Sequence, residues 1–367
     1  MSGDPAQPLL AGAAWIRDPA AAAVLDALEA AGGPDCVRFV GGCVRNAVMG
    51  RPIADIDLAT TLEPDAVTRA LEGAGLKAVP TGLEHGTVTA VSAGRGFEVT
   101  TLRRDVETDG RRAVVAFTRD WSEDADRRDF TLNALYADRS GRVFDPTGQG
   151  LAAAREGRIV FVGDPARRIR EDHLRILRFF RFLAWYGRGE PDAAALAACA
   201  AQASALSGLP AERVLKELLV LLAAQDPRPS VRRMAETGVL VQVLPGVRDR
   251  TRFEGLCEVE ALEGLAPDPV LRLGALFPES ASDVAREAAR LRMSSAQRDR
   301  LVAAAGQDPP LSSWMSPRQL RRGLHLLGAQ VVLDRIRLAW ARAPGAAPAD
   351  WRALIAEANA WTPRTLP

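Results

Sequence analysis

The sequence has few of the residues that build zinc fingers or disulfide frameworks, and it has no long apolar run of the kind that spans a membrane. Its 367 residues include four cysteines and three histidines, and no two cysteines form a CxxC pattern. This spacing excludes zinc fingers and argues against a disulfide framework. No apolar run reaches the roughly 18 residues needed to cross a bilayer. We therefore expect no membrane contact and a reducing compartment, the cytoplasm.

An excess of charge of one sign is also absent. The chain has 47 Lys and Arg residues against 46 Asp and Glu, a net charge of +1, which argues against a uniformly basic nucleic-acid binder but allows a local basic patch. Only Lys77 and Lys216 are lysines. A bias toward arginine is typical of GC-rich genomes, so it is not by itself a sign of phosphate binding. No basic residue precedes Arg17, so we expect no signal peptide.

The patterns that are present divide the chain into two parts. After an amphipathic helix at 20–31, short β-like runs predominate to about residue 150, with helical stretches between them. The predicted strands are 36–40, 87–91, 96–102, 113–118 and 141–146, and the predicted helices among them are 64–74 and 129–137. From Asp164 onward only helical periodicity remains, broken by Pro and Gly. We expect a mixed α+β part followed by an all-α part.

The first candidate site is the stretch "VGGCVRNAV", in which Gly41 and Gly42 lie between a predicted strand and a predicted helix. Glycines allow positive φ and close approach of the backbone to a phosphate, and Arg45 could add a charge-assisted contact. Taken alone, the pair fits an ordinary strand–turn–helix joint better. It is neither a Walker loop nor a GxGxxG motif.

The second is "IADIDLATT", where Asp55 and Asp57 stand two residues apart. On a strand, both carboxylates would face the same side, and two adjacent anions repel unless a divalent cation lies between them. A solvated strand face is the commoner explanation of a lone pair. A glycine turn followed by two candidate Mg²⁺ ligands within about a dozen residues nevertheless has the components for nucleotidyl transfer.

Two further stretches extend this set. Glu98, in the predicted strand "GFEVTTLR", is a third acid that could help to hold metal ions, although an exposed edge-strand glutamate is an equally good interpretation. In "DRRDFTLNAL", Arg127 and Arg128 precede Asp129, the predicted N-cap of the helix at 129–137. Two cations at a helix N-terminus oppose the helix dipole, which is understandable if they bind a triphosphate.

The stretch 167–187, "RRIREDHLRILRFFRFLAWYG", predicts one helix in which four charged residues recur every three positions along one face, above an apolar stripe. These are Asp172, Arg175, Arg178 and Arg181. A solvated face is the simpler interpretation. A carboxylate beside an arginine could, however, accept from the amino group and donate to the ring nitrogen of cytosine or adenine, and reject uracil and guanine.

These motifs together resemble the class II tRNA nucleotidyltransferase and bacterial poly(A) polymerase family. The resemblance rests on "GGCVRN…DID", "EVTTLR", "RRDFTLNAL", "EDHLRILRFFRF" and "AERVLKELLVLL", which cover about residues 38–222 in the family's order. It implies a nucleotidyltransferase head at 1–160, a helical neck that selects the base at 161–225, and a helical RNA-binding body and tail at 226–367.

The resemblance also implies residue roles. Asp55 and Asp57 would bind Mg²⁺ and, with Glu98, form the catalytic set; Gly41, Gly42, Arg45 and Arg128 would bind the nucleotide. Asp172 and Arg175 would face its base, Arg178 and Arg181 would support that pocket, and Glu212, Arg213 and Glu217 would stiffen it. At position 46 the family most often has Asp where this chain has Asn46, which keeps hydrogen bonding but loses the charge.

The implied activity is the addition of C, C and A to tRNA 3′ ends from CTP and ATP, with release of pyrophosphate and with no obligate protein partner. The segment 103–122 corresponds to a flexible element that the family needs for switching from C to A. The alternatives are a poly(A) polymerase, an enzyme adding only CC or only A, and a catalytically idle RNA-binding protein. In the tail, Arg318, Arg321, Arg322, Arg335 and Arg337 could line an RNA groove or form a solvated face.

Overall fold

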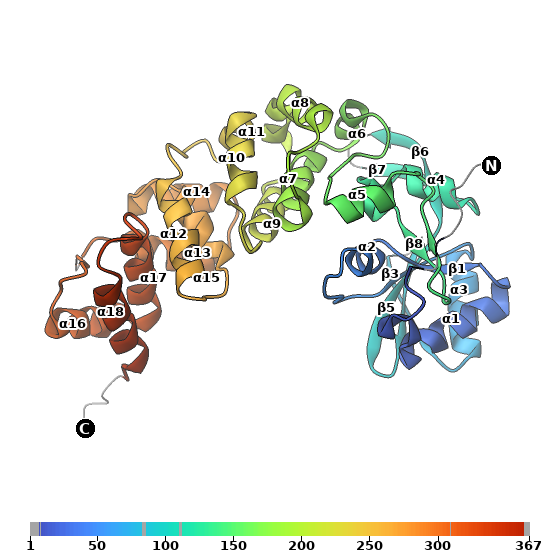
Figure 1. Cartoon of the computed structure of the whole chain (residues 1–367), viewed down its shortest axis with the longest axis horizontal. Helices are drawn as coiled ribbons and strands as arrows, with labels where there is room; N and C mark the ends of the chain where they lie inside the picture. The colour runs from blue at the N-terminus through green and yellow to red at the C-terminus, as the bar shows by residue number, and fades with distance from the viewer. Residues whose placement is uncertain (1–6, 8, 83–85, 110–111, 309, 363–367) are drawn as a thin grey trace. The chain divides into compact units, whose positions relative to one another are not determined.

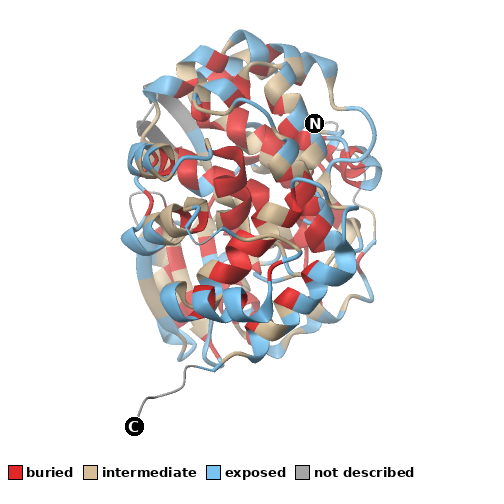
Figure 2. Cartoon of the chain, turned by 90° about the vertical axis from the view of Figure 1, so that its left-hand side faces the viewer, coloured by how far each residue is buried: buried red, intermediate tan, exposed pale blue. Residues whose placement is uncertain are grey.

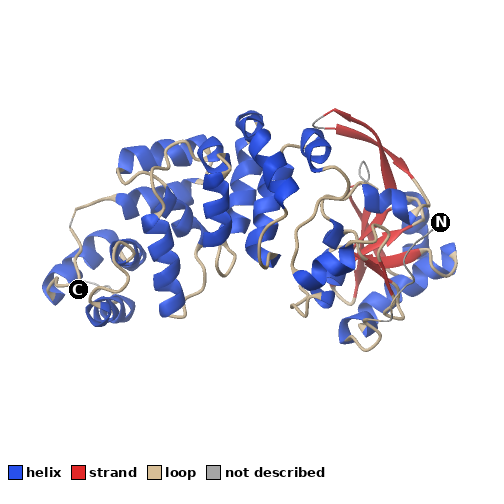
Figure 3. Cartoon of the chain, turned by 45° about the horizontal axis from the view of Figure 1, so that its top comes forward, coloured by secondary structure: helices blue, strands red, loops and turns tan. Residues whose placement is uncertain are grey.

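The computed structural model describes residue 7 and residues 9–82, 86–109, 112–308 and 310–362. His85, which the sequence predicts to be structural, lies outside the described residues. The chain divides into two compact units, Met1–Arg175 with Tyr186–Ala198, and Ile176–Trp185 with Cys199–Pro367. The strands belong to the first unit, and the second is built from helices (Figure 3). The three-part division at residues 160 and 225 stays a prediction.

A mixed sheet forms the centre of the first unit, whose strands and helices are blue to green in Figure 1. It has seven strands in the order β3-β4-β5-β2-β1-β8-β9. The strands are β1 (Val37–Val40), β2 (Asp57–Thr60), β3 (Lys77–Gly82), β4 (Thr87–Ser92), β5 (Arg95–Thr101), β8 (Tyr136–Ala137) and β9 (Val143–Phe144). Only β2 and β5 pair in parallel among these described strands, with Asp57 opposite Glu98. This register places two candidate site residues on neighbouring strands.

The described residues of the first unit up to Glu171 contain six α-helices: α1 (Pro19–Gly32), α2 (Gly42–Val48), α3 (Pro64–Gly73), α4 (Trp121–Asp126), α5 (Gly150–Glu156) and α6 (Pro165–Glu171). Of these, α1, α2 and α3 pack on this sheet. Helix α1 begins where the Asp18 carboxylate accepts from the Ala20 N–H at 2.8 Å, and it packs with α3 against β4. Helix α2 packs on β1 and α5. The short helix α2 therefore follows directly from the strand that carries the glycine turn.

The segment 103–122 contains a separate two-stranded sheet of β6 (Arg103–Asp109) and β7 (Arg112–Phe117), which pair antiparallel. The sequence predicted β7 but not β6, because polar residues of 103–109 gave no apolar alternation. The predicted helix at 129–137 is wrong: a 3₁₀ turn (Thr131–Asn133) is followed by β8. Asp129 is therefore not a helix cap, and its Oδ1 accepts from the Phe130 N–H and from Nδ2 of Asn133.

The second unit is helical, and the described residues after β9 form no further strand, as predicted. Helix α7 (Leu174–Tyr186) and helix α8 (Ala193–Ala201) run through the points where the two units divide. The others are α9 (Ala211–Leu222), α10 (Arg228–Glu236), α11 (Val239–Val243), α12 (Thr251–Leu262), α13 (Pro269–Leu276), α14 (Ala281–Arg290), α15 (Ser295–Ala305), α16 (Pro317–Leu327), α17 (Ala329–Trp340) and α18 (Pro348–Ala360).

Apolar side chains between these helices form the core of the second unit. One cluster joins α16, α17 and α18 through Leu324, Ile336, Trp340 and Leu354, and buried positions are red in Figure 2. Burial of such surface supplies most of the stability of a helical bundle. Across the part of the chain that the structure describes, no helix combines the length and the apolar character needed to span a bilayer.

Candidate nucleotidyl-transfer site

The glycine turn joins β1 to α2. Gly41 has φ 69° and ψ −118°, a conformation that glycine adopts and other residues avoid. Its N–H donates to the Leu135 carbonyl at 3.1 Å. A Cβ atom built on Gly41 would lie 3.5 Å from Nη1 of Arg128. The structure therefore brings together two residues that the sequence predicted separately to bind the nucleotide: Gly41 in the turn, and Arg128, the arginine predicted to bind the triphosphate.

The acidic residues lie around the start of β2. This strand begins at Asp57, so Asp55 precedes it and is exposed, and of the two acids only Asp57 lies on the strand. Burial, and then the negative charges of Glu98 and Asp55, raise the pKa of Asp57 to about 6, while Arg128 opposes this shift. Asp57 is therefore close enough to Glu98, Asp55 and Arg128 for their charges to act on it.

A partly buried carboxylate beside two other acids fits a divalent cation, because a cation offsets both the burial and the repulsion. Within the described ranges, however, no group of three or more His, Cys, Asp or Glu side chains is arranged to hold a metal ion. The assignment of Asp55 and Asp57 as metal ligands, and of Glu98 to the catalytic set, thus stays a prediction.

Arg45 lies on α2 and is only 7% exposed. It donates to the Asn46 Oδ1 from Nε at 3.1 Å and Nη2 at 2.9 Å, to the Asn133 Oδ1 at 2.5 Å, and to the Tyr186 hydroxyl at 2.7 Å. Its guanidinium also lies 4.0 Å from the centre of the Tyr186 ring. Asn46 therefore keeps the hydrogen-bonding role that the sequence suggested. The contribution of Tyr186 was missed, since no local signal links residues 141 positions apart.

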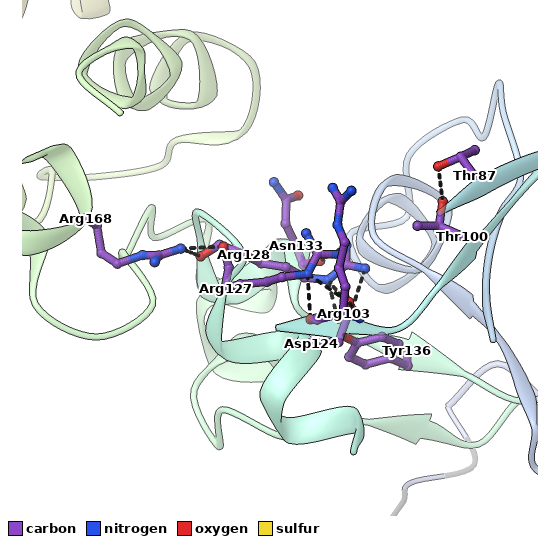
Figure 4. A network of polar contacts seen from close by, with 9 residues as sticks. All are labelled: Thr87, Thr100, Arg103, Asp124, Arg127, Arg128, Asn133, Tyr136 and Arg168. Atoms are coloured by element: carbon purple, nitrogen blue, oxygen red, sulfur yellow. Dashed lines mark hydrogen bonds and ion pairs between the residues drawn. The ribbon is translucent and has the colours of Figure 1, made fainter. Parts of the chain in front are cut away.

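Arg128 is held by a buried acid that the sequence analysis also missed (Figure 4). The side chain of Asp124 is 1% exposed, and its Oδ2 accepts from Nη2 of Arg128 at 2.9 Å and from the Tyr136 hydroxyl at 2.7 Å. Its Oδ1 accepts from Nη2 of Arg127 at 2.7 Å. Burial alone would raise the pKa of Asp124, but the charges of Arg128 and Arg127 outweigh it and lower this pKa to about 2. Asp124 is therefore ionised at neutral pH and fixes both arginines.

The predicted helix at 167–187 is interrupted. Helix α6 ends at Glu171, and Asp172 is extended, with φ −152° and ψ 106°. The Asp172 Oδ1 accepts from the Leu174 N–H at 3.1 Å at the start of α7. Asp172 is thus not on the helical face with the three arginines, because its side chain satisfies a backbone N–H at a helix start.

Arg175 and the two later arginines have different surroundings. Nη1 of Arg175 donates to the Glu171 Oε2 at 2.6 Å and to the Arg168 carbonyl at 2.7 Å. In the second unit, Nε of Arg181 lies 2.9 Å from the Glu217 Oε2, and Nη1 of Arg178 lies 3.9 Å from its Oε1. Glu217 therefore pairs with these two arginines. The stiffening of a base pocket that the resemblance implies for Glu217 stays a prediction.

The tail arginines do not form one set. Arg335 is buried and donates to the carbonyls of Ala303 at 2.8 Å and Asp308 at 2.9 Å, so both interpretations, an RNA groove and a solvated face, are wrong for this residue. Arg318, Arg321 and Arg322 are exposed on α16. The sequence pattern could not distinguish a buried arginine that binds helix-end carbonyls from an exposed one.

Comparison with known proteins agrees with the motifs. The family described as "Poly A polymerase head domain" matches residues 37–160, and "Probable RNA and SrmB- binding site of polymerase A" matches residues 190–250. Together they match half of the chain. The chain belongs to the tRNA nucleotidyltransferase and poly(A) polymerase family, which confirms the resemblance seen in the sequence. Nucleotidyltransferases of this family generally use divalent metal ions.

Individual relatives are similar over most of this chain. "CCA tRNA nucleotidyltransferase 1, mitochondrial" of Mus musculus is 37% identical over 72% of this chain, and a "CCA-adding enzyme" of Levilactobacillus brevis is 39% identical over 62%. The matched regions span 61% and 55% of these relatives. The crystal structure of the Bacillus stearothermophilus CCA-adding enzyme in complex with CTP superimposes with a TM-score of 0.75, at 27% identity, over 93% of this chain and 82% of that one. This similarity confirms the α+β head followed by helices.

Proposed function

We propose that this protein adds C, C and A to the 3′ ends of tRNA, using CTP and ATP and releasing pyrophosphate. The observation that carries the proposal is the position of Arg128. This arginine lies beside the Gly41 turn and acts electrostatically on Asp57. One cation next to both a phosphate-compatible turn and an acidic group is the arrangement that nucleotidyl transfer requires. The names of the relatives support the choice of tRNA, CTP and ATP.

In the proposed reaction, the 3′ hydroxyl of the terminal ribose attacks the α-phosphorus of the nucleotide. A new P–O bond forms, the hydroxyl proton is lost, and the bond to the β-phosphate breaks so that pyrophosphate leaves. Asp55 and Asp57 would hold Mg²⁺, which supplies Lewis-acid stabilisation of the developing charge. Arg128, fixed by Asp124, and Arg45, fixed by Asn46, Asn133 and Tyr186, bind and orient the triphosphate.

We assign base selection to Asp172 and Arg175. The carboxylate accepts from the exocyclic amino group of cytosine or adenine, and the guanidinium donates to the adjacent ring nitrogen. Only Nη1 of Arg175 donates in its contacts with Glu171 and the Arg168 carbonyl, so Nε and Nη2 of the guanidinium would supply the donor to the base. Uracil and guanine present the opposite order of donor and acceptor, so they leave both side chains unpaired.

The activity is tested with the full chain, a tRNA that lacks its terminal CCA, and CTP, ATP or both. We expect two added residues with CTP alone and three with both nucleotides, with no further extension. Long products with ATP alone would instead identify a poly(A) polymerase. No incorporation above background, with RNA binding retained, would identify the idle RNA-binding alternative.

Replacing Arg175 by Ala is expected to reduce the discrimination of CTP against UTP. Loss of one base-reading side chain removes about 1–3 kcal/mol of discrimination, which is roughly 5- to 150-fold. The measurement is the ratio of kcat/KM for the two nucleotides on the same tRNA. An unchanged ratio in a folded Arg175→Ala protein would assign base selection to other residues.

The location also remains a proposal. All four cysteines are free and buried, and burial raises the pKa of the Cys36 and Cys43 thiols to about 11. Such thiols suit a reducing compartment, and we propose the cytoplasm. Relatives that carry "mitochondrial" in their names show that the family also works elsewhere.

A further inference from the structure

Arg168 on α6 is a buried arginine to which the motifs gave no role. It is 7% exposed, and its Nη2 donates to the carbonyls of Arg127 and Arg128, the latter at 2.7 Å. Figure 4 shows its side chain extending to the backbone from which the Arg127 and Arg128 side chains begin. The contact lies within the first unit and joins segments 40 residues apart.

The two carbonyls lie at the end of α4, whose last helical residue is Asp126. Carbonyls at a helix C-terminus have no partner within the helix, and a cation there also interacts favourably with the helix dipole. Arg168 therefore fixes the backbone at 127 and 128, while Asp124 fixes the two side chains from the other direction. The position of the Arg128 guanidinium thus depends on the backbone contact with Arg168 as well as on the contacts of its own side chain.

Arg168 also contacts the residue that holds Arg175. Its Nη1 donates to the Glu171 Oε2, the same oxygen that accepts from Nη1 of Arg175 at 2.6 Å. The carbonyl of Arg168 accepts from Nη1 of Arg175 as well, at 2.7 Å. One buried residue is therefore joined, through its side chain and its backbone, to Arg128 and Arg175, two of the arginines that contact the nucleotide in the proposed function.

We propose that Arg168 is a positioning residue that sets the triphosphate-binding arginine and the base-reading arginine relative to each other. This inference rests on the proposed function. Arg168 does not touch the nucleotide; it holds Arg128 through the backbone and Arg175 through Glu171. Because a displacement of about 1 Å of an orienting group costs on the order of 100-fold in rate, loss of Arg168 affects both phosphate binding and base choice.

The test compares Arg168→Gln with Arg170→Gln, which replaces an exposed arginine of the same helix. We expect Arg168→Gln to weaken CTP binding, measured by calorimetry without tRNA, by about 10-fold or more and to lower the CTP/UTP ratio of kcat/KM by a similar factor. Arg170→Gln should leave both values within about 2-fold. Arg168→Lys, which keeps one cationic donor at the carbonyls, should recover CTP binding more than base discrimination.

A purely structural role for Arg168 would lower the unfolding temperature without changing the CTP/UTP ratio, and that result overturns the proposal. So does a ratio equal to that of Arg170→Gln. If Arg168→Gln does not fold, the same comparison is made with Arg168→Lys, for which an unchanged ratio is again decisive. Wild-type protein in the same assay tests the proposed function separately, because it must add C, C and A whatever the variants do.

Discussion

Replacing Asp57 by Asn is expected to reduce nucleotide addition by roughly a thousandfold or more, because a lost metal ligand removes several kcal/mol of transition-state stabilisation. The same change should not destabilise the fold. Asp57 is partly buried opposite Glu98, and burial and neighbouring negative charges disfavour its ionised form. A neutral amide of the same shape removes that cost, so we expect an unchanged or higher unfolding temperature in the presence of a chelator.

Single-turnover incorporation of CMP and calorimetric unfolding measure the two effects. Glu72→Gln, at an exposed acid on α3, is the matched control and should change neither. Retention of most of the wild-type rate by Asp57→Asn would contradict the metal assignment. A large loss of stability would contradict the electrostatic account of this residue, since it would mean that the carboxylate makes a stabilising contact.

The sequence predicted the positions of strands and helices well where a motif and its local structure coincide. The strand before Gly41 and the strand that carries Glu98 lie within one or two residues of the predicted positions, and a helix that carries Arg45 follows the glycine turn as predicted. Apolar periodicity and glycine determine such elements locally. The family resemblance then related segments that are distant in the sequence, and the pairing of Asp57 with Glu98 on parallel strands is compatible with it.

The wrong predictions have a common physical cause: a polar side chain satisfied a backbone group that the pattern did not reveal. The helical periodicity predicted one continuous helix over 167–187, including Asp172. This aspartate instead accepts from a backbone N–H at the start of α7. Arg335 has the sequence appearance of a surface cation, yet it binds two carbonyls in the core. Tyr186 and Arg168 act through contacts across 141 and 40 residues, which no single-sequence pattern encodes. Asp124 is different: it contacts Arg127 and Arg128 three and four positions further along the chain, a helical spacing that the sequence does contain.

The largest effect on stability is expected from Arg272, a buried arginine of α13 in the second unit. Its side chain is 1% exposed, and Nε donates to the Glu260 Oε2 at 2.6 Å. Nη1 donates to the carbonyls of Leu222 at 2.7 Å and Ala224 at 2.6 Å, just where α9 ends. Burial raises the pKa of Glu260, and the charge of Arg272 opposes that shift.

Arg272→Met is therefore expected to lower the free energy of unfolding by about 3–5 kcal/mol, because it leaves Glu260 buried without its cationic partner and removes the Arg272 donor from the Leu222 and Ala224 carbonyls. The measurement is urea unfolding followed by hydrogen exchange of the amides in α9 and α13. Arg286→Met, at an arginine whose side chain is 67% exposed, is the matched control and should cost less than about 0.5 kcal/mol.

The double variant Arg272→Met with Glu260→Leu separates the two parts of this cost. Removing the carboxylate abolishes the buried charge, so stability should be partly recovered, whereas the carbonyls at the end of α9 still lack the Arg272 donor. Full recovery would mean that capping α9 contributes little, and no recovery would mean that the charge of Glu260 contributes little. A loss below about 1 kcal/mol in Arg272→Met itself would show that water replaces the guanidinium at these carbonyls, and that Arg272 does not hold α9 against α13.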